Sequence, residues 1–154
     1  MAEQEEALKW IVGILKKHNI RFLAVGGLAA KAYGSKRKLV DIDLAMPEKD
    51  FPKILEDIKE YHIGGPGRNK EGQWDCEDVE INYKGQIIEL GGSDKTKIFN
   101  KKSGKWEKFK VNFSKSIIKN DLGINVPIMA KEDLIAYKKI LNRKVDRLDI
   151  DQIS

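Results

Sequence analysis

Apolar residues recur along the chain with two periods, one typical of helices and the other of strands. Spacings of three and four residues predict amphipathic helices over residues 2–18, 48–61 and 131–141. Alternation at every second residue predicts strands over residues 77–83 and 86–90, which form a hairpin. The first helix is expected to pack on the resulting sheet, as helices do in layered α/β folds.

Three shorter segments carry weaker signals. Residues 97–100 and 106–111 resemble the arms of a second hairpin, whose basic turn could touch nucleic acid but is explained more simply by solubility. Residues 124–128 contain a proline, which cannot donate a hydrogen bond to a neighbouring strand. We therefore expect this last segment at the edge of a sheet.

Residues 64–73 are the most loop-like part of the chain, because glycines and a proline are concentrated there after a short predicted strand over residues 61–63. A loop of this length is uncommon without a function. Two interpretations stay open. The segment is either an ordinary surface loop or a lid over a substrate, in which Arg68 or Lys70 contacts phosphate groups.

The stretch Val25–Met46 is the most informative about function. It predicts a strand that ends at Gly26-Gly27, a short helix, and a second strand over residues 41–46. Residues two apart in a strand share a face, so Asp41 and Asp43 project together. Two such carboxylates repel each other unless a cation lies between them, and Mg²⁺ is the usual ion for an all-oxygen site. The glycine turn opens a helix, where backbone N–H groups can bind phosphate.

This order of strand, glycine turn, helix and Asp-x-Asp strand resembles the DNA polymerase beta-type nucleotidyltransferase superfamily. The likeness is to its small prokaryotic branch, which includes lincosamide-type and abortive-infection-type transferases. The matching residues are Gly26, Gly27, Arg37, Asp41 and Asp43. Leu39 departs from the pattern, since the branch often has a hydroxyl residue there. The resemblance implies one α/β (α+β) domain over residues 1–154, with a mixed β-sheet flanked by helices and a C-terminal helical segment.

The superfamily places a third carboxylate on a later strand, and Glu89 is our candidate for it. Glu89 interrupts an otherwise apolar strand, where an acid is costly unless it is paired or bound to metal. The family more often has aspartate at this place. The alternative is that Glu89 points outward from an edge strand, with Glu80 as the reserve candidate for the third acid.

The C-terminal part resembles the ending of the same small transferases, with Lys138, Arg143, Asp146 and Asp149 at matched positions and Val145 as a departure. Lys138 falls within the apolar stripe of its predicted helix. It therefore either extends to the rim or faces an anion-binding cleft, where it would contact phosphate. We interpret Asp146 and Asp149 mainly as structural residues that hold the terminal helices to the active face.

The resemblance implies Mg²⁺-dependent transfer of a nucleoside monophosphate from a nucleoside triphosphate, ATP among the candidates, to a hydroxyl of a small-molecule or protein acceptor. Asp41, Asp43 and Glu89 would hold the metal, with two ions expected. Phosphate groups would lie against Gly26, Gly27, Arg37 and Lys138. A catalytically idle nucleotide-binding or antitoxin-like module of the same fold is the main alternative, and Leu39 favours it.

Composition narrows these possibilities further. A chain of 154 residues predicts one domain, and it has no apolar run long enough to span a membrane. The only cysteine, Cys76, excludes an internal disulfide and a cysteine-based zinc site.

The acidic start shows no secretory signal, so we expect a cytoplasmic protein. A net charge of +5 fits an anionic substrate but also a solvated surface, and nucleic acid is not the expected partner. Whether the chain forms a homodimer stays open.

Overall fold

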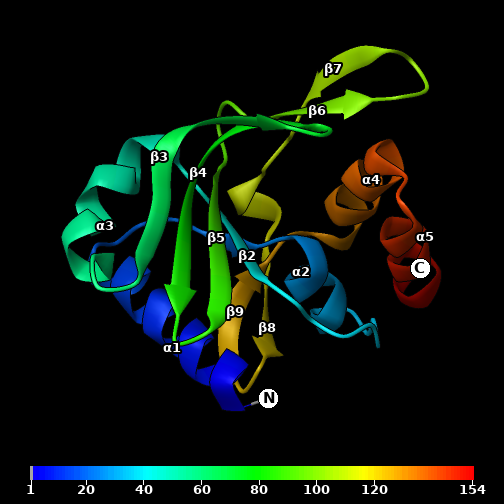
Figure 1. Cartoon of the computed structure of the whole chain (residues 1–154). Coiled ribbons are helices and arrows are strands. Elements are labelled where there is room, and N and C mark those ends of the chain that lie inside the picture. Colours follow the sequence, from blue (N-terminus) through cyan, green and yellow to red (C-terminus); the bar gives the residue numbers. More distant parts are fainter. Residues whose placement is uncertain (1) are drawn as a thin grey trace.

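The computed structural model describes residues 2–154, which form a curved mixed β-sheet with helices on both sides (Figure 1). The strands are β1 (Leu23–Ala24), β2 (Ile42–Met46), β3 (His62–Glu71), β4 (Trp74–Tyr83), β5 (Gln86–Gly92), β6 (Lys97–Asn100), β7 (Lys105–Lys108), β8 (Ile117–Asp121) and β9 (Ile124–Ile128). The helices are α1 (Ala2–Lys17), α2 (Gly26–Ala32), α3 (Phe51–Ile58), α4 (Lys131–Leu141) and α5 (Lys144–Ile153). Short 3₁₀ turns lie at Glu48–Asp50 and Phe113–Lys115. The α/β (α+β) class predicted from the sequence is confirmed.

The strands follow the order β7-β6-β4-β5-β2-β1-β9-β8, and β3 pairs with β4 outside this path. Two pairs are parallel, β2 with β5 and β1 with β9, and the other pairs are antiparallel. The centre of the sheet is therefore formed by β5, β2 and β1. The end of β1 leads directly into α2, beside the start of β2.

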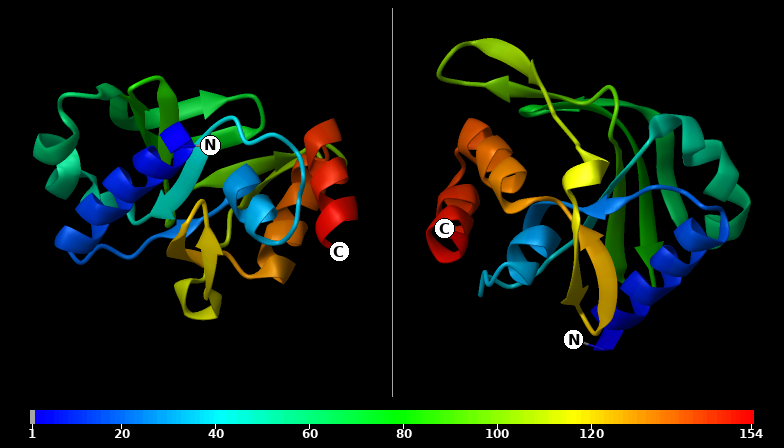
Figure 2. Two further views of the ribbon diagram at one scale, coloured as in Figure 1. Left: turned by 90° about the horizontal axis from the view of Figure 1, so that it is seen from below. Right: turned by 180° about the vertical axis from the view of Figure 1, so that it is seen from behind.

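The helices divide into two groups (Figure 2). α1 and α3 pack together on one side of the sheet, while α2, α4 and α5 gather on the other. The apolar stripe of α1 supplies Leu8, Ile11 and Leu15 to the core, all fully buried. Ile42 and Leu44 of β2 are buried as well. The predicted packing of the first helix on the sheet is thus confirmed, and the opposite side of the sheet is left for a site.

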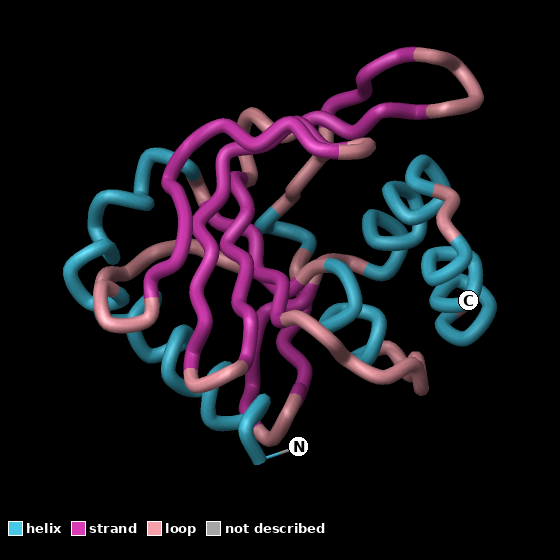
Figure 3. Tube along the Cα trace, viewed as in Figure 1, coloured by secondary structure: helices cyan, strands magenta, loops and turns pink. Residues whose placement is uncertain are grey.

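The interpretation of residues 64–73 as a loop or lid is wrong. Residues 64–71 belong to β3, which runs antiparallel to β4 as one arm of a long hairpin, and Gly72 and Gln73 form the turn of this hairpin (Figure 3). The glycines and the proline lie where the register shifts, between His62 and Gly67, so bulges accommodate them. Arg68 forms two hydrogen bonds of 2.8 Å with Asp75, which tie its side chain to β4.

The expectation of an edge strand at residues 124–128 is also wrong, because β9 lies between β1 and β8. Its pairing with β1 is confined to Ile128 opposite Ala24, beyond Pro127. The missing N–H group of the proline is therefore tolerated inside the sheet. The predicted helix over residues 48–61 is also shorter than expected, since a 3₁₀ turn precedes α3.

Among the described residues 2–154, no helix combines the length and the apolarity needed to cross a lipid bilayer.

Candidate functional site

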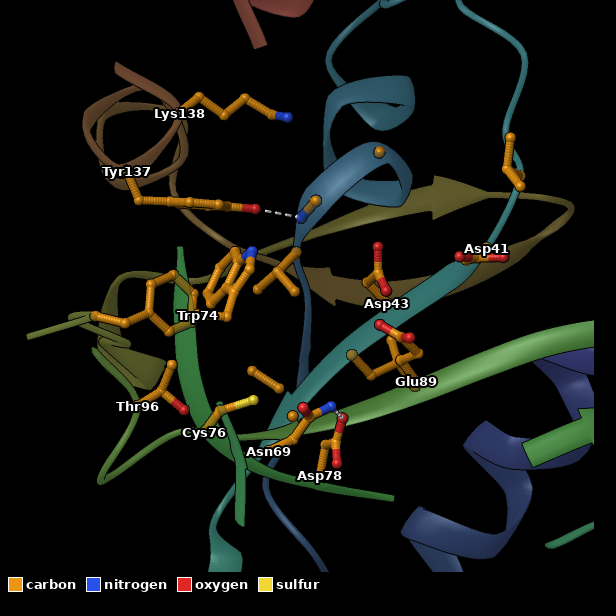
Figure 4. A pocket seen from close by; sticks show the side chains of 18 of the residues that line it. Asp41, Asp43, Asn69, Trp74, Cys76, Asp78, Glu89, Thr96, Tyr137 and Lys138 are labelled. Atoms are coloured by element: carbon orange, nitrogen blue, oxygen red, sulfur yellow. Dashed lines mark hydrogen bonds between the residues drawn. The ribbon is translucent and has the colours of Figure 1, made fainter. Parts of the chain in front are cut away.

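A cavity of about 460 Å³ lies between the sheet and the group formed by α2, α4 and the loop before β2. Every site residue predicted from the sequence lines it: Gly26, Gly27, Arg37, Asp41, Asp43, Glu89 and Lys138. The cavity has a size typical of small-molecule sites. The close-up in Figure 4 shows acidic side chains in one part of it and aromatic rings in another.

The acidic part is built by the register of three neighbouring strands. Asp43 of β2 lies beside Glu89 of β5, and Glu89 lies opposite Glu80 of β4. Paired residues in a sheet point to the same face, so these three carboxyl groups form a row across the cavity. Glu89 therefore occupies a central strand and faces the cavity, and the alternative of an outward-facing edge residue is wrong.

Asp41 joins this row from the residue just before β2. Its side chain and that of Asp43 lie on the cavity side, while Ile42 and Leu44 between and after them are buried on the other face. The strand alternation predicted from the sequence is thus confirmed. Asp41, Asp43 and Glu89 gather in one region of the cavity (Figure 4).

Two carboxyl groups of this row, those of Asp43 and Glu89, hold their protons unusually tightly. Burial, together with the negative charges of Glu89 and Asp41, raises the pKa of Asp43 to about 8. Burial, together with Glu80 and Asp41, raises the pKa of Glu89 to about 7. Clustered carboxylates repel one another, and a hard divalent cation bound among them would relieve this repulsion. Within residues 2–154, no three carboxylate, imidazole or thiol side chains are already arranged so that they could hold a metal ion.

The glycine turn brings the start of α2 against the acidic row. Gly26 has φ +59°, and a Cβ atom there would lie 2.7 Å from Oδ2 of Asp43. A Cβ atom on Gly27 would lie 3.0 Å from Nη2 of Arg37. Gly26 thus requires glycine, because its φ is positive and the side chain of Asp43 occupies the space, whereas a side chain at Gly27 would press against Arg37. The N–H of Gly26 already donates a 2.5 Å hydrogen bond to the hydroxyl of Tyr137.

Arg37 is held over the glycine turn by the terminal helix α5. Its Nε and Nη2 donate hydrogen bonds of 3.1 and 2.8 Å to the two carboxylate oxygens of Asp149. Such a two-point contact fixes the plane of the guanidinium group. Its Nη1 bonds to no group of the protein between residues 2 and 154, and Arg37 is one of the residues that line the cavity, so this nitrogen remains available to a ligand.

Lys138 lies beneath the same cavity and is only 1% exposed. Its Nζ lies 3.0 Å from Oδ2 of Asp149 and 3.2 Å from Oδ1 of Asp146. The interpretation that Lys138 extends to the rim is therefore wrong. The predicted structural role of the two aspartates agrees with this geometry, because they connect α5 to α4 and, through Arg37, to the loop after α2.

The electrostatics of Asp149 reflect this role. Burial alone would raise its pKa, but hydrogen bonds from Arg37, Lys138 and Ser35 lower the pKa to about 2. Asp149 is therefore ionised at any working pH. The two cations next to the cavity are already compensated, which leaves the acidic row as the dominant charge of the site.

An aromatic wall that sequence reasoning missed closes the other side of the cavity. Trp74, Phe109 and Tyr137 meet edge to face, with ring centroids 4.9–6.2 Å apart. Other unpredicted lining residues are Asn69, Cys76, Asp78 and Thr96 (Figure 4). The alternation that exposes Glu80 also places Asp78, Cys76 and Trp74 on the cavity face, and this pattern could have identified them. Burial raises the pKa of Cys76 to about 12, so its thiol is not a nucleophile here.

The sequence matches no protein-family model, and no curated protein matches it. Solved structures do resemble it. A candidate nucleotidyltransferase from Thermotoga maritima superposes with a TM-score of 0.74 at 19% identity, over 97% of this chain and 91% of the other. The lincosamide antibiotic adenylyltransferase LnuA, solved with lincomycin, gives a TM-score of 0.62 at 15% identity, over 98% and 95% of the two chains. The chain has the nucleotidyltransferase fold.

A third structure extends this comparison. ANT(2″)-Ia in complex with adenylyl-2″-tobramycin has a TM-score of 0.62 at 16% identity, over 98% of this chain and 90% of the other. The superfamily resemblance inferred from the glycine turn and the Asp-x-Asp strand is therefore confirmed for the fold. Because fold alone does not fix chemistry, the function must be argued from the cavity itself.

The raised pKa of Asp43 makes the stability of the folded protein depend on pH. The folded protein keeps a proton on Asp43 up to about pH 8, whereas the unfolded chain releases it near the ordinary pKa of 3.8. Unfolding thus releases a proton within this window, so the free energy of unfolding falls as pH rises. In the presence of a chelator, we expect a lower melting temperature at pH 8 than at pH 5.5.

The Asp43→Asn variant supplies the control for this prediction, since it removes the titrating group and keeps its volume. Its melting temperature should fall less between the same two pH values, and at pH 8 it should exceed that of the parent by roughly 4 °C or more. An equal fall in both proteins would contradict the assignment of the pH dependence to Asp43.

Proposed function

We propose that the chain is a nucleotidyltransferase that moves a nucleoside monophosphate from a nucleoside triphosphate to a hydroxyl group of a small molecule. One observation carries the proposal. Three carboxylates, Asp41, Asp43 and Glu89, face the same cavity as the glycine turn and as Arg37. This places acidic groups suited to a divalent cation beside donors suited to phosphate oxygens.

Mg²⁺ is the cation we propose for Asp41, Asp43 and Glu89, with two ions as the working model. When bound, such ions would neutralise phosphate oxygens and make an acceptor hydroxyl more acidic. Asp43 and Glu89 support this assignment because burial and mutual repulsion raise their pKa values. Glu80 lies one strand farther from Asp43, and we therefore assign it no place among the ligands.

The protein's own groups would orient the phosphates and carry part of the developing charge. Arg37 is preoriented by Asp149 and keeps its Nη1 donors for the ligand. Lys138 contributes positive potential from below, since it is close enough to Asp43 to lower that residue's pKa. Gly26 and Gly27 permit close approach, because no side chain projects from the turn.

A small-molecule acceptor fits better than a protein one. The cavity is of the size that holds a nucleotide and a compact partner, and an aromatic wall bounds it. LnuA is described as a lincosamide antibiotic adenylyltransferase, and ANT(2″)-Ia was solved with adenylyl-2″-tobramycin, which also supports a small molecule. The acceptor of this chain is a matter for experiment.

A catalytically idle nucleotide-binding module is the second candidate. Leu39 favours it, because an apolar side chain lines the cavity where related transferases often have a hydroxyl residue. The absence of a preformed metal centre among residues 2–154 favours it too. Both candidates predict nucleotide binding, and only the first predicts transfer.

The two candidates are separated by incubating the protein with Mg²⁺, α-³²P-labelled ribonucleoside triphosphates and a panel of hydroxyl-bearing small molecules. Transfer of label to an acceptor, with release of pyrophosphate, supports the enzyme. Binding of Mg²⁺–nucleotide without any labelled product supports the idle module. A protein that binds no nucleotide would contradict both.

A further inference from the structure

The hydroxyl group of Tyr137 is a buried polar group at the cavity that the proposed function has not used. Tyr137 lies on α4, with its ring packed against Trp74 and Phe109 and only 6% of its surface exposed. Figure 4 shows the hydroxyl at the cavity end of the ring, where it meets the backbone of the glycine turn.

The oxygen of this hydroxyl already accepts one hydrogen bond. It accepts the N–H of Gly26 at 2.5 Å, which fixes the oxygen as an acceptor. A tyrosine hydroxyl also carries one hydrogen to donate. No acceptor for that hydrogen is found among residues 2–154, since the bond from Gly26 is the only one that the hydroxyl makes.

The surroundings indicate which ligand atom would accept this hydrogen. The proposed function places phosphate groups at the glycine turn, which the hydroxyl contacts through Gly26, and Arg37 lies against the same turn. Asp43 is close enough to raise the pKa of Tyr137, but it makes no hydrogen bond with the hydroxyl. Burial raises the same pKa most strongly, so the hydroxyl keeps its proton.

We propose that Tyr137 is a ligand-binding residue whose hydroxyl donates a hydrogen bond to a non-bridging phosphate oxygen of the nucleoside triphosphate. The inference rests on the proposed function, because it takes the nucleotide to lie in this cavity. The Gly26 N–H orients the hydroxyl, and the aromatic wall fixes the ring. The donor is therefore in place before the ligand arrives, without rearrangement of the side chain.

The test compares Tyr137→Phe with Tyr33→Phe. The first variant keeps the ring and removes the hydroxyl at the cavity. The second removes a hydroxyl that bonds to the carbonyl oxygen of Met129 at 2.7 Å, away from the cavity. Calorimetry with Mg²⁺ measures binding of the α,β-methylene analogues of the four ribonucleoside triphosphates, and of the corresponding nucleosides. Melting temperatures without ligand show whether each variant folds as the parent does.

We expect Tyr137→Phe to weaken binding of the triphosphate analogue about tenfold, the usual effect of losing one hydrogen bond to a charged group. Nucleoside binding should change less than about twofold, and Tyr33→Phe should leave both unchanged. Unchanged triphosphate affinity in Tyr137→Phe would overturn the inference. Equal weakening of triphosphate and nucleoside would also overturn it, because the hydroxyl would then only support the turn. If the parent binds none of the analogues, the proposed function fails, and this inference fails with it.

Discussion

Replacement of Asp43 by asparagine is expected to lower the rate of nucleotidyl transfer about 10³-fold, as loss of a group that stabilises transition-state charge commonly does. Asparagine keeps the volume of the side chain and its hydrogen-bonding oxygen but removes the negative charge that Asp43 would carry when a divalent cation is bound. Asp43 lies at the end of the carboxylate row nearest the glycine turn, and so its charge is the one closest to the proposed phosphates. The measurement is the initial rate with the acceptor identified by labelling.

The matched controls are Glu89→Gln and Glu80→Gln, which neutralise the next two members of the row. If Glu89 is the third metal ligand, its variant should lose activity nearly as strongly as Asp43→Asn, and should need more Mg²⁺ for half-maximal rate. Glu80→Gln should retain most of the activity. Equal losses for Glu80 and Glu89, or full activity in Asp43→Asn, would contradict the assignment of the ligands.

Replacement of Asp149 by alanine should destabilise the protein more than any other single change at the site. Asp149 accepts hydrogen bonds from Ser35, Arg37 and Lys138 and is fully buried. Removing one partner of a buried ion pair typically costs about 3–5 kcal/mol, because the other charge stays buried. For a chain of this size, we expect the melting temperature to fall by roughly 10 °C.

Asp151→Ala is the control for this second prediction, since Asp151 lies exposed on the same helix. Its effect on the free energy of unfolding should stay within about 0.5 kcal/mol. Adding Lys138→Met to Asp149→Ala should restore part of the lost stability, because it removes a buried cation that has lost one of its two carboxylate partners. Fully additive losses would show that Lys138 and Asp149 do not stabilise each other.

Much of the fold could be predicted from periodicity. The last amphipathic pattern has the bounds of α4, and the first differs from α1 by a single residue. The errors have physical causes. In residues 64–73, glycine and proline favour a loop locally, yet residues 67–71 pair with β4 one after another, and bulges absorb the irregular residues before them. Such long-range pairing leaves no signal in a single segment of sequence.

The candidate site was predictable where a residue conflicts with its surroundings. Glu89 interrupts an apolar strand, and Lys138 interrupts an apolar helical stripe. Both side chains line the cavity. Tyr137 gave no such signal, because a tyrosine on the buried side of a helix resembles an ordinary core residue. Its contact with Gly26 joins positions 111 residues apart and depends on the packing of α4 against α2.

The ion pairs that reach from α5 to Arg37 and Lys138 also have a consequence for biosynthesis. A ribosome makes the glycine turn and all three cavity acids well before it reaches Lys144–Ile153. Until that helix emerges, both cations lack the carboxylate of Asp149, and the nascent chain cannot complete the charge pattern of its cavity. Messages that end early would therefore yield a polypeptide holding nearly every residue of the site yet unable to assemble it.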